Sequence, residues 1–215
     1  MADEHAEHAV EGAEGEPEVP PNMTDEELQW LREQLKAAAL EAGVEGEGGE
    51  DWEDPSGGEL SALLQAVEDG DAARVAEVLK DFKADINTAG PDGDTALHLA
   101  CLYGHEDCVR ALLAGGADAN AVNKEDGSTA LHDAAAGGYL EICELILEKG
   151  DAKKLISRFD EDGESALHTA ARGNHLDVVK FLIARGADPN AQNGYGNKPV
   201  DEADEQPVID YLKSL

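Results

Sequence analysis

Apolar residues recur along most of this chain in short blocks that return at an almost constant step. The block TALHLA at 95–100 comes back as TALHDA at 129–134 and as SALHTA at 165–170. Weaker copies begin at Ser61 and at Lys198. The apolar third residue of each block stands 33 to 36 residues from the next, at Leu63, Leu97, Leu131, Leu167 and Val200. Short helical blocks at this step predict stacked repeats rather than one irregular core.

Each block is followed by a tight turn and a second apolar stretch. Four residues after the last alanine stands Gly70, Gly104, Gly138 or Asn174, all of which tolerate a positive φ. Apolar pairs such as Leu112-Leu113 follow, and two copies then continue with Gly-Ala-Asp. Asp-Gly pairs precede three of the blocks. The pattern therefore predicts turn, helix, turn and helix in every unit.

These motifs resemble the ankyrin-repeat family, whose units combine a turn, T-P-L-H-x-A, G-H with an apolar second helix, and G-A-D. The resemblance covers about residues 59–215, with three full copies between two degenerate end units. It implies an all-α solenoid of about four to five stacked helix-turn-helix units with β-turn or hairpin tips. Neighbouring units bury the apolar face that one unit cannot bury alone. We expect units at about 59–89, 90–123, 124–159, 160–192 and 193–215.

The repeat pattern also accounts for most residues that suggest chemistry. His98, His132 and His168 share the position that the family uses for hydrogen bonds between adjacent units. The three cysteines are an odd number without CxxC spacing, and they fall at helix positions where Cys acts as a small hydrophobe. Walker A, GxGxxG and GxSxG motifs are absent. The sequence therefore predicts no enzyme activity, no cofactor and no metal site.

The N-terminal part of the chain has a different composition. Residues 1–59 hold 19 of the 48 acidic residues but only two cations, Arg32 and Lys36. Few large apolar side chains occur in residues 1–23, which predicts a disordered acidic tail. The stretch 44–58 predicts an acidic, Gly-rich linker.

One helix is expected between the tail and the linker, at 24–43. Thr24 and Glu27 form a capping-box pattern. Leu28, Leu31 and Leu35 then follow at helical spacing. This amphipathic helix either docks on the repeats or binds a partner, and the sequence leaves both interpretations open.

The formal charge of −32 restricts the class of partner. A negative field of this size repels phosphate backbones and anionic membranes. The sequence contains no apolar run of the roughly 20 residues that a membrane span needs, and its N-terminus has the features of neither a signal peptide nor a transit peptide. We expect a soluble, monomeric protein of the cytoplasm or nucleus that binds a protein, not nucleic acid or membrane.

The resemblance implies a binding surface made of the turn tips and the exposed side of the first helices. Carboxylates predominate at these positions, with a few apolar anchors, which predicts a basic partner. The alternative is that the acidity serves only solubility. The candidate residues are Glu68, Asp69, Asp92, Asp94, Leu102, Tyr103, Glu125, Asp126, Glu161, Asp162, Glu164, Arg172 and Tyr195.

The longest connection between units, residues 151–163, departs from the repeat pattern. It carries Lys153, Lys154, Arg158 and Phe159 and is either a longer turn or a contact loop.

Small acidic ankyrin-repeat proteins that act as chaperones of ribosomal proteins suggest a function by analogy. The expectation is a non-enzymatic escort that binds a basic client, such as a ribosomal protein or a histone, on its concave face. The alternative is a regulatory adaptor that recruits a signalling, ubiquitin-ligase or transcription partner.

Overall fold

The computed structural model describes residues 52–215, which form one compact unit of stacked helices. Within this range the helices come as five pairs with one additional short helix, and no strand is formed. The bounds in chain order are α2 (Glu59–Glu68), α3 (Ala72–Asp81), α4 (Ala96–Leu102), α5 (Glu106–Ala114), α6 (Ala130–Ala136), α7 (Leu140–Lys149), α8 (Ala152–Ile156), α9 (Ala166–Arg172), α10 (Leu176–Ala184), α11 (Pro199–Glu202) and α12 (Gln206–Lys213).

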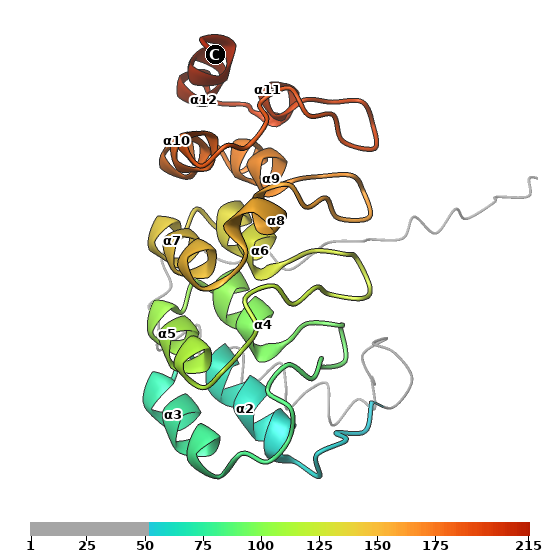
Figure 1. Ribbon diagram of the computed structural model, residues 1–215, viewed down its shortest axis with the longest axis vertical. Coiled ribbons are helices and arrows are strands. Elements are labelled where there is room, and N and C mark those ends of the chain that lie inside the picture. The colour runs from blue at the N-terminus through green and yellow to red at the C-terminus, as the bar shows by residue number, and fades with distance from the viewer. Residues whose placement is uncertain (1–51) are drawn as a thin grey trace, which may run out of the picture. The chain divides into compact units, whose positions relative to one another are not determined.

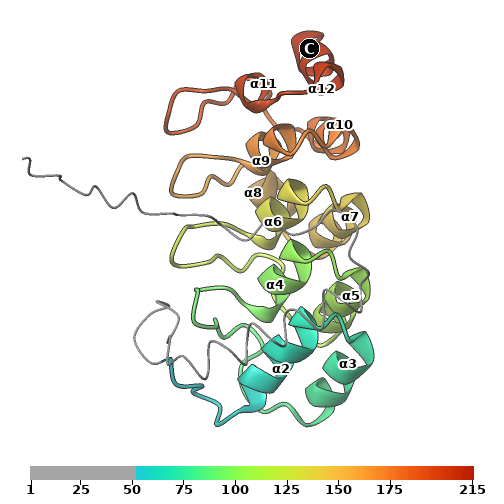
Figure 2. The ribbon, with the colours of Figure 1, turned by 180° about the vertical axis from the view of Figure 1, so that it is seen from behind.

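The two helices of each pair belong to two parallel rows. The first helices α2, α4, α6, α9 and α11 pack against one another, and the second helices α3, α5, α7, α10 and α12 form the other row. The turn tips all project from one side of the stack, at the right in Figure 1 and at the left in Figure 2. The predicted all-α stack of about four to five repeats is therefore confirmed.

The core is aliphatic and runs continuously through the stack. Leu63, Leu97, Leu131 and Leu167, which mark the repeat in the sequence, are each at most 1% exposed. All three cysteines are buried free thiols within this core. They pack as small apolar side chains, as the sequence pattern predicts.

The repeated histidines fix both the start of each first helix and the spacing between repeats. In repeat 3 the Thr129 backbone N–H donates to Nδ1 of His132, at 3.2 Å. The other ring nitrogen of His132 lies 3.3 Å from the carbonyl oxygen of Glu164 in the next repeat. His168 makes the same kind of contact with the carbonyl oxygen of Asn197. These bonds between neighbouring units are the ones that the family resemblance implies.

His98 departs from this arrangement. Its Nδ1 accepts from the Thr95 backbone, but its buried Nε2 has no hydrogen-bond partner among the described residues. Burial lowers the pKa of His98 to about 4, so the ring is neutral at physiological pH. The ring faces the backbone of Ala121 and Ser128 at the junction with repeat 3, but less closely than the other two histidines face theirs.

The tight turns between paired helices adopt the left-handed backbone that the sequence predicts. Gly104 has φ 71°, and Asn174 takes the equivalent place in repeat 4 with φ 59°. The ring of Tyr139, from the next repeat, covers Gly104 so closely that a Cβ atom there would overlap it. Glycine at this position therefore allows both the turn and the close approach of repeats.

The connection after α7 forms a short helix, α8, in place of the expected longer turn or contact loop. Asp151 caps α8 by accepting a hydrogen bond from the Lys154 N–H, and Leu155 anchors it with only 3% of its side chain exposed. In repeats 2 and 4 this position carries a Gly-Ala-Asp turn. The insertion is thus an ordered replacement of that turn.

The first repeat begins before the boundary that composition suggests. Trp52 is half-buried against the core, and the Asp54 carboxylate accepts from the backbone N–H groups of Ser56 and Ser61 at 2.7 and 2.8 Å. Residues 52–58 therefore pack on α2 and do not form a free linker. The tail expected at 1–23, the helix expected at 24–43 and linker residues 44–51 lie outside the described residues.

Candidate protein-binding surface

A partly buried ion-pair network joins repeats 4 and 5 next to the turn tips. Its guanidinium comes from Arg172, the last residue of α9. Arg172 pairs with Glu164, which directly precedes the cap of the same helix, and its Nε lies 3.4 Å from Oε2 of Glu202, the fourth residue of α11. Asn193 donates to both carboxylates, at 2.9 Å to Glu202 and 3.3 Å to Glu164. We call these four residues the arginine site.

The opposite charges of the arginine site stabilise each other through direct contacts. Burial acts to raise the pKa of Glu202, but hydrogen bonds from Asn197, Asn193 and Arg172 outweigh it and hold this pKa below its usual value. Burial acts to lower the pKa of Arg172, and the attraction of Glu164 outweighs it and raises that pKa. Glu202 and Arg172 are therefore ionised together, which is the condition for a stable, partly buried pair.

Repeats 2 and 3 place side chains of the same kind at three of these four positions. Asp94 directly precedes the cap of α4, Asp133 is the fourth residue of α6, and the Asn123 amide donates to Asp94 at 2.7 Å. At the end of α4, however, the residue is Leu102. We call Asp94, Leu102, Asn123 and Asp133 the carboxylate site. It has the oxygen atoms of the arginine site without its guanidinium.

Among the described residues, the carboxyl groups of the carboxylate site lack a neighbouring cation of the chain itself, and their hydrogen bonding and pKa values reflect this. Oδ2 of Asp133 is buried and has no hydrogen-bond partner within residues 52–215. Burial, with added repulsion from Asp94 and Asp126, raises the pKa of Asp133 to about 8. Burial likewise raises the pKa of Asp94, with added repulsion from Asp126 and Asp92, although Asn123 acts in the opposite direction. These two carboxyl groups would gain from a nearby cation.

Most of the predicted binding residues lie on the surface as expected. Leu102, Tyr103 and Tyr195 are 45%, 49% and 73% exposed. The tip carboxylates are exposed except for Asp94, which is half-buried, and Glu164, which is 5% exposed. The exposed carboxylates are Glu68, Asp69, Asp92, Glu125, Asp126, Glu161 and Asp162.

Some predicted binding residues are already engaged within the chain. Arg172 and Glu164 pair with each other. The Tyr195 hydroxyl donates to Asp162 at 3.1 Å, and Asp69 lies 3.6 Å from Arg74. The assignment of all thirteen residues to one partner-binding surface remains a prediction.

Sequence reasoning overlooked Asp133 and Asn123. The signal was present in the motif, because the fifth letter of TALHDA is Asp where the other two full copies have Leu99 and Thr169. This carboxylate singles out Asp133 in the motif, but its burial is seen only in the packed repeats.

Metal-binding clusters and membrane-spanning helices are both absent between Trp52 and Leu215. Within that range no cluster of His, Cys, Asp and Glu has the arrangement needed to hold a metal ion. None of the helices described there has the length and apolar character of a membrane span.

Comparison with known proteins identifies the repeats. The family described as ankyrin repeats (3 copies) matches residues 47–123, 63–156 and 115–193. Ankyrin repeat domain-containing protein 13B of Mus musculus is 39% identical over 85 residues, which is 38% of this chain and only 13% of that protein. Notch-regulated ankyrin repeat-containing protein of Xenopus laevis is 34% identical over 88 residues, 40% of this chain and 76% of that protein.

A third relative is protein phosphatase 1 regulatory subunit 27 of Mus musculus, 34% identical over 88 residues, 41% of this chain and 56% of that protein. The first of these relatives is matched over a small fraction of its length, so the likeness concerns the repeats. The repeat motifs, the paired helices and the family match agree, and the chain belongs to the ankyrin-repeat family.

Proposed function

We propose that this protein is a non-enzymatic escort that binds a basic protein client through the carboxylate site and the acidic tips around it. Ankyrin repeats are protein-interaction modules. The observation that favours a basic client is the similarity between the carboxylate site and the arginine site. Two repeats further along the stack, the same arrangement of carboxylates and amide holds an arginine of the chain itself. A partner's arginine would make the corresponding contacts with Asp94 and Asp133.

The surroundings of the carboxylate site suit an arginine or lysine side chain. Leu102 and Tyr103 are about half exposed beside it and offer apolar surface for the methylene stem of the cation. The Tyr103 ring can also face a guanidinium. Arginine would be favoured over lysine, because its planar fork donates to two oxygen atoms at once.

Binding of such a cation would release a proton. At pH 7 the raised pKa of Asp133, about 8, keeps much of this carboxyl protonated in the free protein. A guanidinium stabilises the ionised form, so it binds more tightly as the pH rises through 8. The affinity for a basic client should therefore increase from pH 6.5 to pH 8.5.

Affinity capture with the full chain tests this proposal. Lysate proteins retained at low salt are eluted with high salt and identified by mass spectrometry, in parallel with the variant Leu102→Arg. We expect basic proteins to elute at high salt from the unmodified chain and to be depleted on the variant, whose own arginine fills the site. Captured proteins that are not basic and that resist high salt would overturn the escort function.

A regulatory adaptor is the second candidate, and the names of the relatives favour it. One is a regulatory subunit of protein phosphatase 1, and another is the SMC5-SMC6 complex localization factor protein 1 of Homo sapiens. Deleting residues 1–51 separates the two functions, since it leaves Trp52 and Asp54 in place. Escort binding should weaken gradually, because the tail adds only long-range attraction. Recruitment by an adaptor should be lost completely or remain unchanged.

In both proposals the protein acts as a monomer in the cytoplasm or nucleus. Sedimentation of the full chain at several concentrations would test the monomeric state. A concentration-dependent increase in mass would contradict it.

A further inference from the structure

A groove of about 570 Å³ lies between α8 and the turn that follows α10. Ala152 and Ile156 of α8, Phe159 and Ala191 give it apolar walls, while Lys153 and Arg185 stand at its edge. It shares no residue with the carboxylate site or the arginine site. The groove exists because α8 replaces the Gly-Ala-Asp turn found in other repeats.

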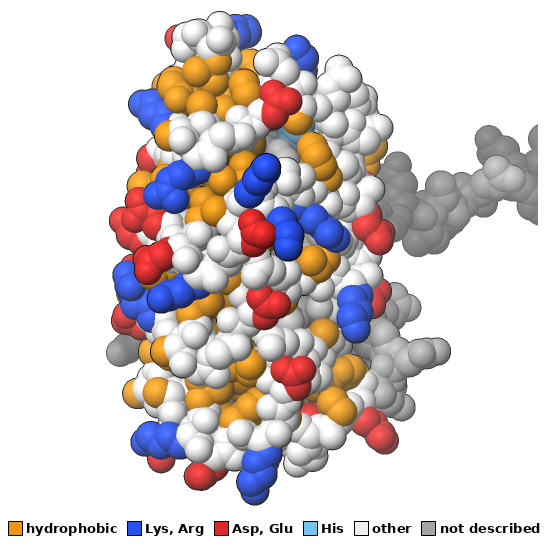
Figure 3. All heavy atoms as spheres, viewed as in Figure 1, with side chains coloured by type: hydrophobic (Ala, Val, Ile, Leu, Met, Phe, Trp, Pro, Cys, Tyr) orange, Lys and Arg blue, Asp and Glu red, His pale blue; other side chains and the backbone are white. Residues whose placement is uncertain are grey.

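The groove carries more cations than carboxylates in a chain that is strongly acidic. Its lining holds Lys153 and Arg185 against Asp188, whereas the whole chain has a net charge of −32. Lys153, Arg158 and Arg185 are exposed, and within residues 52–215 none of them has a carboxylate oxygen within 4.0 Å. Figure 3 shows Lys and Arg side chains gathered around α8 in the middle of this face.

Two features preorganise the groove for a ligand. The Arg185 guanidinium lies over the Phe181 ring, 4.5 Å from its centroid, which limits the freedom of that side chain. Leu155 fixes α8 to the core, whereas Phe159 leaves 43% of its surface exposed at the groove. An exposed aromatic ring next to unpaired cations is typical of a surface that binds an apolar anchor flanked by acidic groups.

We propose that this groove binds an acidic peptide segment of a protein partner. A large apolar side chain of the peptide packs against Phe159 and Ile156, and flanking carboxylates pair with Lys153 and Arg185. Charge complementarity selects this occupant. Nucleic acid fits less well, because the walls are apolar and suit the large side chain of a peptide. This inference does not depend on the basic client.

Fluorescence anisotropy with the full chain provides the test. The probe is a labelled 12-residue peptide of Asp and Glu with one central Trp, measured at about 0.15 M salt, where screening acts beyond about 8 Å and suppresses remote charges. We expect saturable binding that falls about tenfold or more in Lys153→Glu/Arg185→Glu and about threefold or more in Phe159→Ala.

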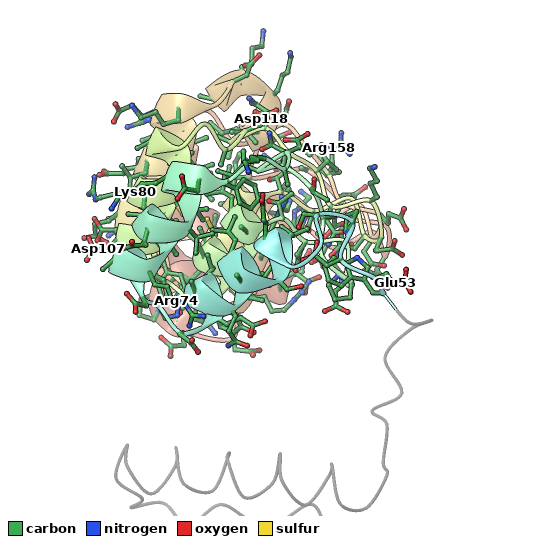
Figure 4. All side chains as sticks on the ribbon, turned by 90° about the horizontal axis from the view of Figure 1, so that it is seen from below. Glu53, Arg74, Lys80, Asp107, Asp118 and Arg158 are labelled. Atoms are coloured by element: carbon green, nitrogen blue, oxygen red, sulfur yellow. The ribbon has the colours of Figure 1, made fainter. Side chains whose placement is uncertain are left out.

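The matched control reverses the charge of two exposed lysines at the ends of the stack, Lys80 of α3 and Lys213 of α12. Figure 4 labels Lys80 beside α3, away from Arg158. The control variant Lys80→Glu/Lys213→Glu should retain the affinity within about twofold, since these charges are screened from the groove.

Three outcomes would overturn the proposal. The first is the absence of saturable peptide binding. The second is an equal loss of affinity in the groove variant and in the control. The third is tighter binding of a single-stranded oligonucleotide of equal charge than of the peptide. Circular dichroism of each variant would establish that the helices are retained.

Discussion

Two junctions of the stack, between repeats 2 and 3 and between repeats 4 and 5, share one arrangement of polar side chains. The pKa of the half-buried carboxyl group is nevertheless raised at the first junction and lowered at the second. In the arginine site hydrogen bonds from Asn197, Asn193 and Arg172 hold the pKa of Glu202 below its usual value. In the carboxylate site, where Leu102 replaces the arginine, the pKa of Asp133 is raised to about 8. The comparison indicates that the donors around a half-buried carboxylate, the guanidinium among them, decide whether it stabilises the fold or stays available to a partner.

The largest effect is expected from converting the arginine site into a second carboxylate site. Arg172→Leu leaves Glu164, only 5% exposed, without its cation. Because 52% of the Arg172 side chain is exposed, we expect less than the full cost of breaking a buried pair. The loss should be about 1–3 kcal/mol of unfolding free energy. Urea denaturation at pH 7 measures it, and an unchanged midpoint would contradict the role given to Arg172.

The reciprocal change should stabilise the protein. Leu102→Arg places a guanidinium at the position from which Arg172 reaches its two carboxylates, and Leu102 is exposed enough to accept the longer side chain. We expect a gain of about 1–2 kcal/mol at pH 7. The pKa of Asp133 should fall below 8, which NMR titration of its carboxyl carbon can follow. Leu102→Gln is the uncharged control and should give neither effect.

The raised pKa of Asp133 makes stability depend on pH in a definite direction. The folded protein keeps this proton up to about pH 8, whereas the unfolded chain loses it near pH 4. Between these values the folded state binds more protons, so this group lowers stability as the pH rises and has no further effect above pH 8. Asp133→Asn should remove that decline and add about 1–2 kcal/mol at pH 8. Denaturation at pH 5 and pH 8 checks the difference.

The smallest effect on stability is expected for an ion pair in the row of second helices. Arg110 pairs with Glu106 one turn away on α5, with 54% and 40% of the two side chains exposed. Arg110→Ala should cost only about 0.3–0.5 kcal/mol. The two variants should therefore differ in unfolding free energy. An equal loss in Arg110→Ala and Arg172→Leu would mean that removing any arginine has this effect, and it would contradict the special role given to the arginine site.

The repeat period was sufficient to predict the paired helices, their buried leucines and their positive-φ turns. Each of these depends on residues within one unit or on identical contacts between units. The positions of Gly104 and Asn174 are examples, because the backbone they require follows from the local turn.

The sequence could not reveal features that arise between units. Asp133 is charged and stands in a helix, and only the packing of the neighbouring repeats buries its Oδ2. The pairing of Arg172 with Glu202 likewise joins residues 30 positions apart. The helix α8 is five residues long, too short to be stable alone, and depends on the burial of Leu155.

The carboxylate site has a mechanical consequence. In a solenoid each unit is held by its two neighbours, so the array responds to stretching at its least cohesive junction. The seam between repeats 2 and 3 contains the buried Oδ2 of Asp133, unpartnered among the described residues, next to Asp94. A cation bound there would have to be released before these two repeats could separate. Such a cation would stiffen the whole array.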